Sequence, residues 1–292
     1  MQMKHTVKMT MVLVAIFFLA QLLGLLIIQK YIDIQKTAET GQTAFEDLPL
    51  GIERPPVQAQ YSFIYIMSAV LMGTAILFVL IKFQLKRIWK LWYFLAVFIG
   101  MTIAFSAFIP VRAATVSAFI IAAWKVLRPN VIIHNLSELF IYGGLAAIFV
   151  PIMNIFAAVM LLLFISVYDM YAVWKSKHMI ALAKFQSSNN MFAGFYVPYT
   201  YKSTEKTKKI ASGAKEAKSA VLGGGDIAFP LLFAGSIFAQ LGMIAYIVSC
   251  TATIALAVLL LKGKKDTFYP AMPFLTIGCL VGYGIILLVK VM

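Results

Sequence analysis

The sequence predicts an all-α polytopic membrane protein, because of its composition, the lengths of its apolar segments and the placement of its basic residues. Of the 292 residues, 62% are hydrophobic, and the mean hydropathy is +0.91. One soluble globule of this size cannot bury that much apolar surface. A helix crosses a bilayer with about 20 apolar residues, and several segments of this length follow one another along the chain.

Nine apolar segments are predicted to be transmembrane helices. The first is expected to be an uncleaved span, since it is longer than the apolar part of a usual signal peptide and no A-x-A pattern follows it. The fourth is short, and Pro110 and Pro151 mark tight links before the fourth and sixth. The segments lie near 9–29, 61–81, 91–110, 113–127, 131–150, 152–174, 219–239, 241–261 and 269–289.

The lysines and arginines predict a cytoplasmic N-terminus and an outside C-terminus. With that orientation, 20 of the 25 basic residues fall in cytoplasmic segments, as the positive-inside rule requires. Residues 30–60 form an outer loop, and residues 175–218 form a basic inner loop whose nine lysines suit anionic lipid headgroups. The net charge of +14 therefore needs no nucleic-acid partner. We expect a multi-pass protein of the cell membrane, in contact with the lipid bilayer.

Two acidic residues inside the spans are predicted to lie at one depth. Asp169 lies six residues before Lys175, at the inner end of the sixth span, and Asp226 lies eight residues after Lys218, at the inner end of the seventh. At 1.5 Å per residue these offsets are about 9 and 12 Å. A carboxylate in hydrocarbon is costly and usually functional. Because consecutive spans run antiparallel, we expect the two to face each other on the cytoplasmic side of the midplane.

Two carboxyl groups that share a low-dielectric site cannot both ionise at low cost, so one keeps a proton and the pair titrates as a unit. An aspartic protease needs this state: one group takes a proton from water while the other donates to the peptide carbonyl. No metal and no cofactor are expected. The three histidines are scattered and form no nucleophile–base grouping; they are His5, His134 and His178.

Three glycines precede the second aspartate. Gly223, Gly224 and Gly225 leave room for another backbone or a substrate strand to approach Asp226, and a helix that starts with them bends or unwinds easily. The alternative is that small residues merely let two membrane helices pack closely. The aspartate that follows immediately favours the first interpretation.

A proline-containing segment, "FYPAMPF", lies at the inner start of the ninth span. Pro270 and Pro273 remove backbone donors around Ala271 and Met272, which leaves polar backbone groups available in a cavity and able to pair with an extended peptide. The alternative is proline in the first turn of a helix, which is common.

Together, "YD" at Tyr168–Asp169, "GGGD" at Gly223–Asp226 and "PAMP" at Pro270–Pro273 resemble the presenilin and signal peptide peptidase family of intramembrane aspartyl proteases. The resemblance implies that Asp169 and Asp226 are catalytic, that Gly223 and Gly225 shape the helix start, and that Pro270, Ala271 and Pro273 support the substrate. Met272 replaces the family's usual leucine, a change between residues of similar volume.

The second proline and the N-inside orientation resemble the presenilin branch, and the length looks like that of a compact microbial, archaeal homologue. The resemblance implies transmembrane segments as substrates, which must unwind before water reaches their carbonyls. It also implies no obligatory partner subunit; self-association stays open. The inner loop, with "NNMFAGFYVPY", is either self-cleaved as in animal presenilins or a plain connecting loop.

Five further side chains have competing interpretations. His134 and Glu138 form an i, i+4 pair, either part of a metal site or proton relay or simply satisfied within the bundle. Tyr168 is either a hydroxyl donor that supports Asp169 or a packing aromatic. Cys250 and Cys279 lie in apolar runs and are expected to pack without a disulfide.

A proton-coupled secondary transporter or channel is the rival function, since membrane carboxylates and broken helices also line ion paths. No internal repeat is detectable, and the proline segment lies at the depth of the aspartates. Both observations favour the protease.

Overall fold

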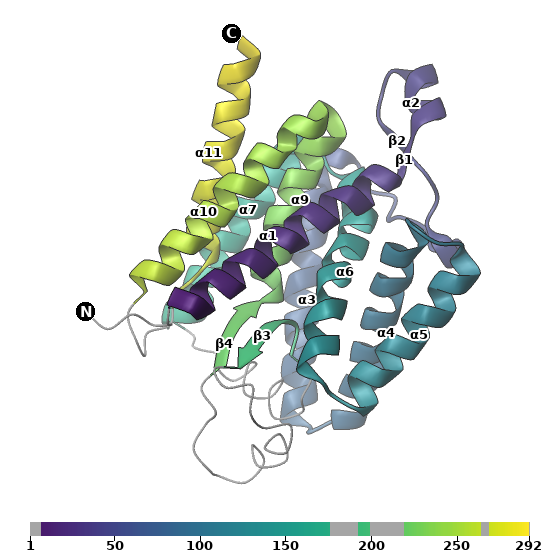
Figure 1. The fold of residues 1–292 in the computed structure, drawn as a ribbon, viewed down its shortest axis with the longest axis vertical. Helices are drawn as coiled ribbons and strands as arrows, with labels where there is room; N and C mark the ends of the chain where they lie inside the picture. The colour runs from purple at the N-terminus through teal and green to yellow at the C-terminus, as the bar shows by residue number, and fades with distance from the viewer. Residues whose placement is uncertain (1–6, 176–191, 199–218, 264–268, 292) are drawn as a thin grey trace.

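The structure is a computed structural model that describes residues 7–175, 192–198, 219–263 and 269–291. Within these ranges, a long helix lies in each of the nine predicted segments (Figure 1). They are α1 (Val7–Lys30), α3 (Ser62–Lys82), α4 (Lys86–Ser106), α5 (Val111–Leu127), α6 (Val131–Phe149), α7 (Ile155–Met170), α9 (Gly224–Leu241), α10 (Tyr246–Lys262) and α11 (Met272–Val291).

By length and composition, seven stretches of the described chain qualify as membrane spans. The number is below nine for two reasons. Helix α5 has only 17 residues, and α9 and α10 form one run of 39 residues, joined by the 3₁₀ turn η6 (Gly242–Ala245). The helical, multi-pass fold is confirmed; nine crossings and the orientation of the termini stay predictions.

The main correction concerns the predicted span 219–239. Residues Ser219–Gly223 form a strand, β4, which pairs antiparallel with β3 (Gly194–Pro198), from Gly194 opposite Gly223 to Pro198 opposite Ser219. An apolar run of five residues suits a strand as well as a helix, and the glycines end it. The helix proper begins five residues later than predicted.

Prolines account for other shifted boundaries. Helix α4 ends at Ser106 rather than at 110, since the residue before Pro110 is biased away from helix. It also starts at Lys86 rather than at 91, a shift that no proline explains. Pro151 lies in the 3₁₀ turn η3 (Val150–Ile152), so α7 starts at Ile155 instead of 152 and is followed by a π-helical turn, η4 (Tyr171–Lys175). Helix α11 starts at Met272 instead of 269.

The predicted outer loop lies at the opposite end of the molecule from β3–β4 (Figure 1). It is anchored to the bundle, because the Tyr31 hydroxyl donates to the Ile103 carbonyl (2.8 Å) and Arg54 Nε donates to the Ala147 carbonyl (3.3 Å). Its elements are β1 (Ile32–Asp33), α2 (Ile34–Thr40), β2 (Ala44–Phe45), paired with β1, and the 3₁₀ turns η1 (Pro49–Gly51) and η2 (Ala59–Tyr61).

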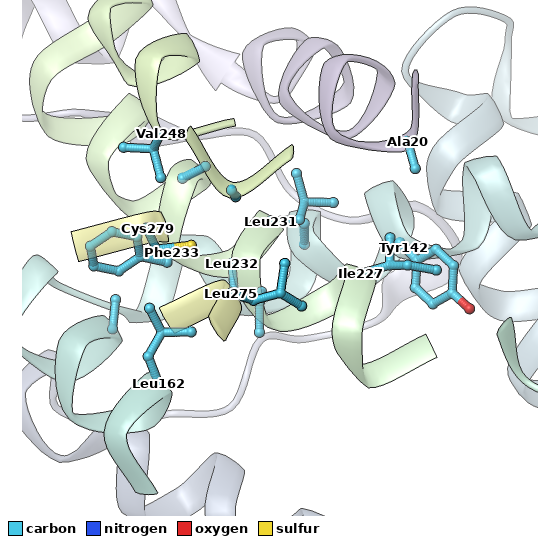
Figure 2. Packing of buried hydrophobic residues seen from close by; sticks show 14 of the residues in the cluster. Ala20, Tyr142, Leu162, Ile227, Leu231, Leu232, Phe233, Val248, Leu275 and Cys279 are labelled. Carbon is cyan, nitrogen blue, oxygen red and sulfur yellow. The ribbon is translucent and has the colours of Figure 1, made fainter. Parts of the chain in front are cut away.

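Helix α9 is the centre of the bundle. Every residue from Pro230 to Phe238 is buried, as expected of a helix that is surrounded on all sides, and α9 contacts α1, α6, α7, α10 and α11. Figure 2 shows Leu231, Leu232 and Phe233 of this helix inside the main apolar cluster, with Cys279 beside Phe233. Both cysteines are free; Cys279 is buried in the core, whereas Cys250 is exposed and does not pack inside the bundle as predicted.

Candidate active site

Asp169 lies in the last turn of α7 and is held by the start of α11. Its carboxyl oxygen Oδ2 accepts a hydrogen bond from the Met272 amide (3.0 Å), and the Ala271 amide also interacts with it. One turn earlier, the Ser166 and Thr276 hydroxyls lie 2.7 Å apart. Two groups of contacts therefore fix α7 to α11 beside Asp169, which is buried.

The proline segment places one proline in the first turn of a helix, whereas its pairing with an extended peptide stays a prediction. Pro273 lies in the first turn of α11, where a missing N–H costs nothing, and the Ala271 carbonyl accepts from the Leu275 amide (3.1 Å). The Met272 amide, which has no partner within its own helix at this position, is used by Asp169. Met272 itself is buried, as a residue of leucine-like volume allows.

Asp226 lies in the first turn of α9, directly after β4. A carboxylate is favoured there because it faces the positive end of the helix dipole. The Gly223 amide interacts with it, and a Cβ added to Gly223 would lie 3.2 Å from Asp226 Oδ2. The side chain therefore turns back over the N-terminus of its own helix.

Gly224 makes the closest approach of the glycine run. Its amide donates to the Ala193 carbonyl (3.1 Å), and an added Cβ would lie 2.7 Å from the Tyr142 hydroxyl on α6. The glycines were predicted to let another backbone or a substrate strand come close. At Gly224 the close neighbours are Tyr142 and Ala193 of the same chain. At Gly225 an added Cβ would meet only the Phe229 ring of the same helix (3.3 Å).

Two residues that the sequence analysis overlooked act on the start of α9. Pro230 lacks the N–H that would bond to the Asp226 carbonyl four residues earlier. The buried Gln21 of α1 donates through Nε2 to the next carbonyl, that of Ile227 (3.0 Å). A glutamine in the first apolar span was a signal available in the sequence, because polar residues in spans usually have a partner.

The two aspartates belong to one electrostatic site. Helix α7 packs against both α9 and α11, and the charge of Asp169 acts on the Asp226 carboxyl. The Tyr168 hydroxyl instead lies 3.4 Å from Thr74 Oγ1 on α3. Two interacting carboxyl groups in an apolar bundle can share a proton and hold a water between them.

The His134–Glu138 pair is satisfied within the bundle. Glu138 Oε1 pairs with Lys125 Nζ at 2.5 Å, and both side chains are buried. The described residues contain no group of three or more histidine, cysteine, aspartate or glutamate side chains able to hold a metal. Lys125, one of the 20 basic residues assigned to cytoplasmic segments, is buried and points into the bundle from the last turn of α5.

The fold is that of a helical, multi-pass membrane protein. The family model described as "Signal-peptide peptidase, presenilin aspartyl protease" matches residues 14–292, and the chain belongs to this family. It is therefore an intramembrane aspartyl protease and a multi-pass membrane protein.

Solved structures agree with this assignment at the level of the fold. Two crystal forms of "a presenilin family intramembrane aspartate protease" are similar to this chain. In the C222 form the TM-score is 0.60 and the identity 16%, over 94% of each chain. In the P2 form the values are 0.59 and 19%, over 94% of this chain and 96% of the other. A search of curated proteins gives no match.

Proposed function

We propose that Asp169 and Asp226 are the catalytic pair that hydrolyses peptide bonds within transmembrane segments of other proteins. The observation that carries this proposal is their placement: Asp169 lies in the last turn of α7 and Asp226 in the first turn of α9, and these two helices pack against each other beside the start of α11. Family membership supports the reaction class.

In the proposed mechanism one aspartate is ionised and the other carries a proton. The ionised carboxylate takes a proton from the water, whose oxygen then bonds to the peptide carbon, while the protonated carboxyl group donates to the carbonyl oxygen. Collapse of the tetrahedral intermediate breaks the C–N bond. The proton taken from water goes to the leaving nitrogen, and a hydroxyl group of the intermediate returns a proton to the carboxylate that had donated one. Both aspartates return to their starting states, with no covalent enzyme intermediate.

The substrate presents an extended segment to this site. Strand β4 pairs with β3 on one side, and no strand in the described part of the chain pairs with its other edge. That edge runs directly into Gly223 and α9, so an unwound substrate that adds a strand there comes within reach of Asp226. Pro270, Ala271, Met272 and Pro273 line the Asp169 side and support the same segment. Single-span proteins with an inside C-terminus are the expected substrates.

Incubation of the purified protein with a single-span transmembrane peptide in lipid tests the proposal. The wild type should cleave the peptide, Asp169→Ala and Asp226→Ala should each abolish cleavage, and a hydroxyl-bearing transition-state mimic should inhibit. Chelators and serine reagents should have no effect. Full cleavage by either variant would reject the catalytic pair, and proton flux into vesicles without cleavage would favour the transporter.

A further inference from the structure

Helix α6 presents a row of polar side chains to strand β3. His134 Nε2 lies 2.7 Å from the Gly194 carbonyl, to which it donates because that oxygen only accepts. Glu138 Oε2 accepts from the Gly194 amide (3.1 Å). Asn135 bonds twice to Tyr196, through Nδ2 to its carbonyl (2.8 Å) and through Oδ1 from its amide (3.0 Å).

These contacts complete the edge of β3 that faces away from β4. In an antiparallel pair, the amide and carbonyl of every second residue point to the outer edge. For Gly194 and Tyr196 all four of these groups have partners on α6. The three α6 side chains thus take the place of a neighbouring strand, and we call them the α6 clamp: His134, Asn135 and Glu138.

A buried ion pair fixes the clamp. Besides the Gly194 amide, Glu138 accepts from Lys125 Nζ (2.5 Å) and from the Tyr142 hydroxyl. Lys125 Nζ also donates to Ser137 Oγ (2.7 Å). Both carboxylate oxygens therefore have donors, as a buried charge requires. Its orientation toward β3 is consequently set from α5 and from its own helix.

The clamp connects to the catalytic helix by two routes. Strand β3 pairs with β4, which passes without a break into Gly224, two residues before Asp226. The Tyr142 hydroxyl, bonded to Glu138, also faces Gly224 across the distance that only a glycine permits. Figure 2 shows the Tyr142 ring beside Ile227 at the edge of the apolar cluster, with the hydroxyl turned away from the labelled apolar side chains.

We infer that the α6 clamp positions Asp226 by holding the β3–β4 pair, so that His134, Asn135 and Glu138 are positioning residues of this protease. This inference rests on the proposed catalytic role of Asp226. Asp169 is held differently, by a direct hydrogen bond from the start of α11. Loss of the clamp should therefore let β4 and the start of α9 move while the rest of the bundle stays folded.

Asn135→Leu tests the inference, with Leu136→Ala as the matched control, because Leu136 is the next residue on α6 and is 53% exposed. Hydrogen–deuterium exchange is measured on peptides covering 192–198 and 219–223, together with thermal unfolding and cleavage kinetics in the same detergent. For Asn135→Leu we expect exchange about tenfold faster in both strands and kcat about tenfold lower, with KM changed less than about twofold. The control should match the wild type.

Asn135→Asp keeps the acceptor for the Tyr196 amide and loses the donor, so its exchange rate and kcat should fall between those of the wild type and Asn135→Leu. This variant decides the matter if Asn135→Leu does not fold. The inference is overturned if the variant that folds has the same hydrogen–deuterium exchange rates in β3 and β4, and the same kcat, as the control. Suppose instead that hydrogen–deuterium exchange in β3 and β4 is faster in the variants, but the wild-type protein cleaves no substrate. This result would reject the proposed function, while the stabilisation of the two strands by the α6 clamp would still hold.

Discussion

The two aspartates are held in opposite ways. Asp169 ends a continuous helix and is fixed by direct contacts, a hydrogen bond from the Met272 amide and, one turn earlier, the Ser166–Thr276 pair. Asp226 begins a helix that follows a strand, and its position depends on β4, β3 and the polar row on α6. One side of the site is set by helix packing and the other by a small sheet. A substitution on the Asp226 side can therefore affect catalysis from a greater distance, through the contacts that link α6, β3, β4 and α9.

The largest expected effect does not distinguish the two sides. Asp169→Asn and Asp226→Asn keep the size of each side chain and remove its ability to ionise, so each should lower kcat by about 10³-fold or more if general acid and general base are both required. Single-turnover cleavage of a transmembrane peptide measures this. A loss in one variant only would mean that the two carboxyl groups do not act as a pair.

Gly224→Ala should damage the Asp226 side next most strongly. The new Cβ would lie 2.7 Å from the Tyr142 hydroxyl, so the start of α9 must shift, and kcat should fall about 10- to 100-fold, in line with a small misplacement of a reacting group. Gly73→Ala on α3 is the control, because a Cβ there meets nothing within 4 Å.

The double variant Gly224→Ala/Tyr142→Phe sharpens that prediction, since it removes the hydroxyl that the new methyl group meets. Its kcat should exceed that of Gly224→Ala alone. Equal or lower activity in the double variant would show that the clash with Tyr142 is not what disturbs the site.

Thr276→Val should weaken the Asp169 side more mildly. It removes the hydroxyl that pairs with Ser166 between α7 and α11, and such bonds in membrane bundles contribute about 0.6 kcal/mol on average. We expect a comparable loss of stability in a reversible unfolding assay and a fall in kcat of no more than about threefold. A loss as large as that of Gly224→Ala would mean that the two sides are equally sensitive.

Tyr168→Phe should have the smallest effect. The Tyr168 hydroxyl lies 3.4 Å from Thr74 Oγ1 on α3, a long hydrogen bond of little strength, whereas the Asp169 carboxyl is held by α11. We expect kcat within about twofold of the wild type. A tenfold loss would restore the alternative in which this hydroxyl supports Asp169.

The same contrast explains how far the sequence could predict the structure. The helices and the location of Asp169 follow from apolar length and from the cost of a charge in the membrane, which are local properties. Strand β4 could not be distinguished from the first turn of a helix, because its five residues show no decisive period and its partner β3 lies 21 residues earlier, from Pro198 to Ser219.

Lys125 illustrates a second limit. A lysine near the end of a span is predicted to face the aqueous side, because its long side chain usually reaches the interface. Here it turns inward because it donates a hydrogen bond from Nζ to the Glu138 carboxylate on the next helix. Only the packing of α5 on α6 shows this, and it changes His134 and Glu138 from a candidate metal or relay site into the support of a strand.

An experimental structure with a hydroxyl-bearing transition-state mimic bound tests the central claim most directly, through the distances from that hydroxyl to the two carboxyl groups. We expect the hydroxyl to lie within about 3 Å of an oxygen of both Asp169 and Asp226, the reach of a hydrogen bond to a reacting group. A mimic held by only one of them, with the other carboxyl group turned to a different cavity, would contradict it.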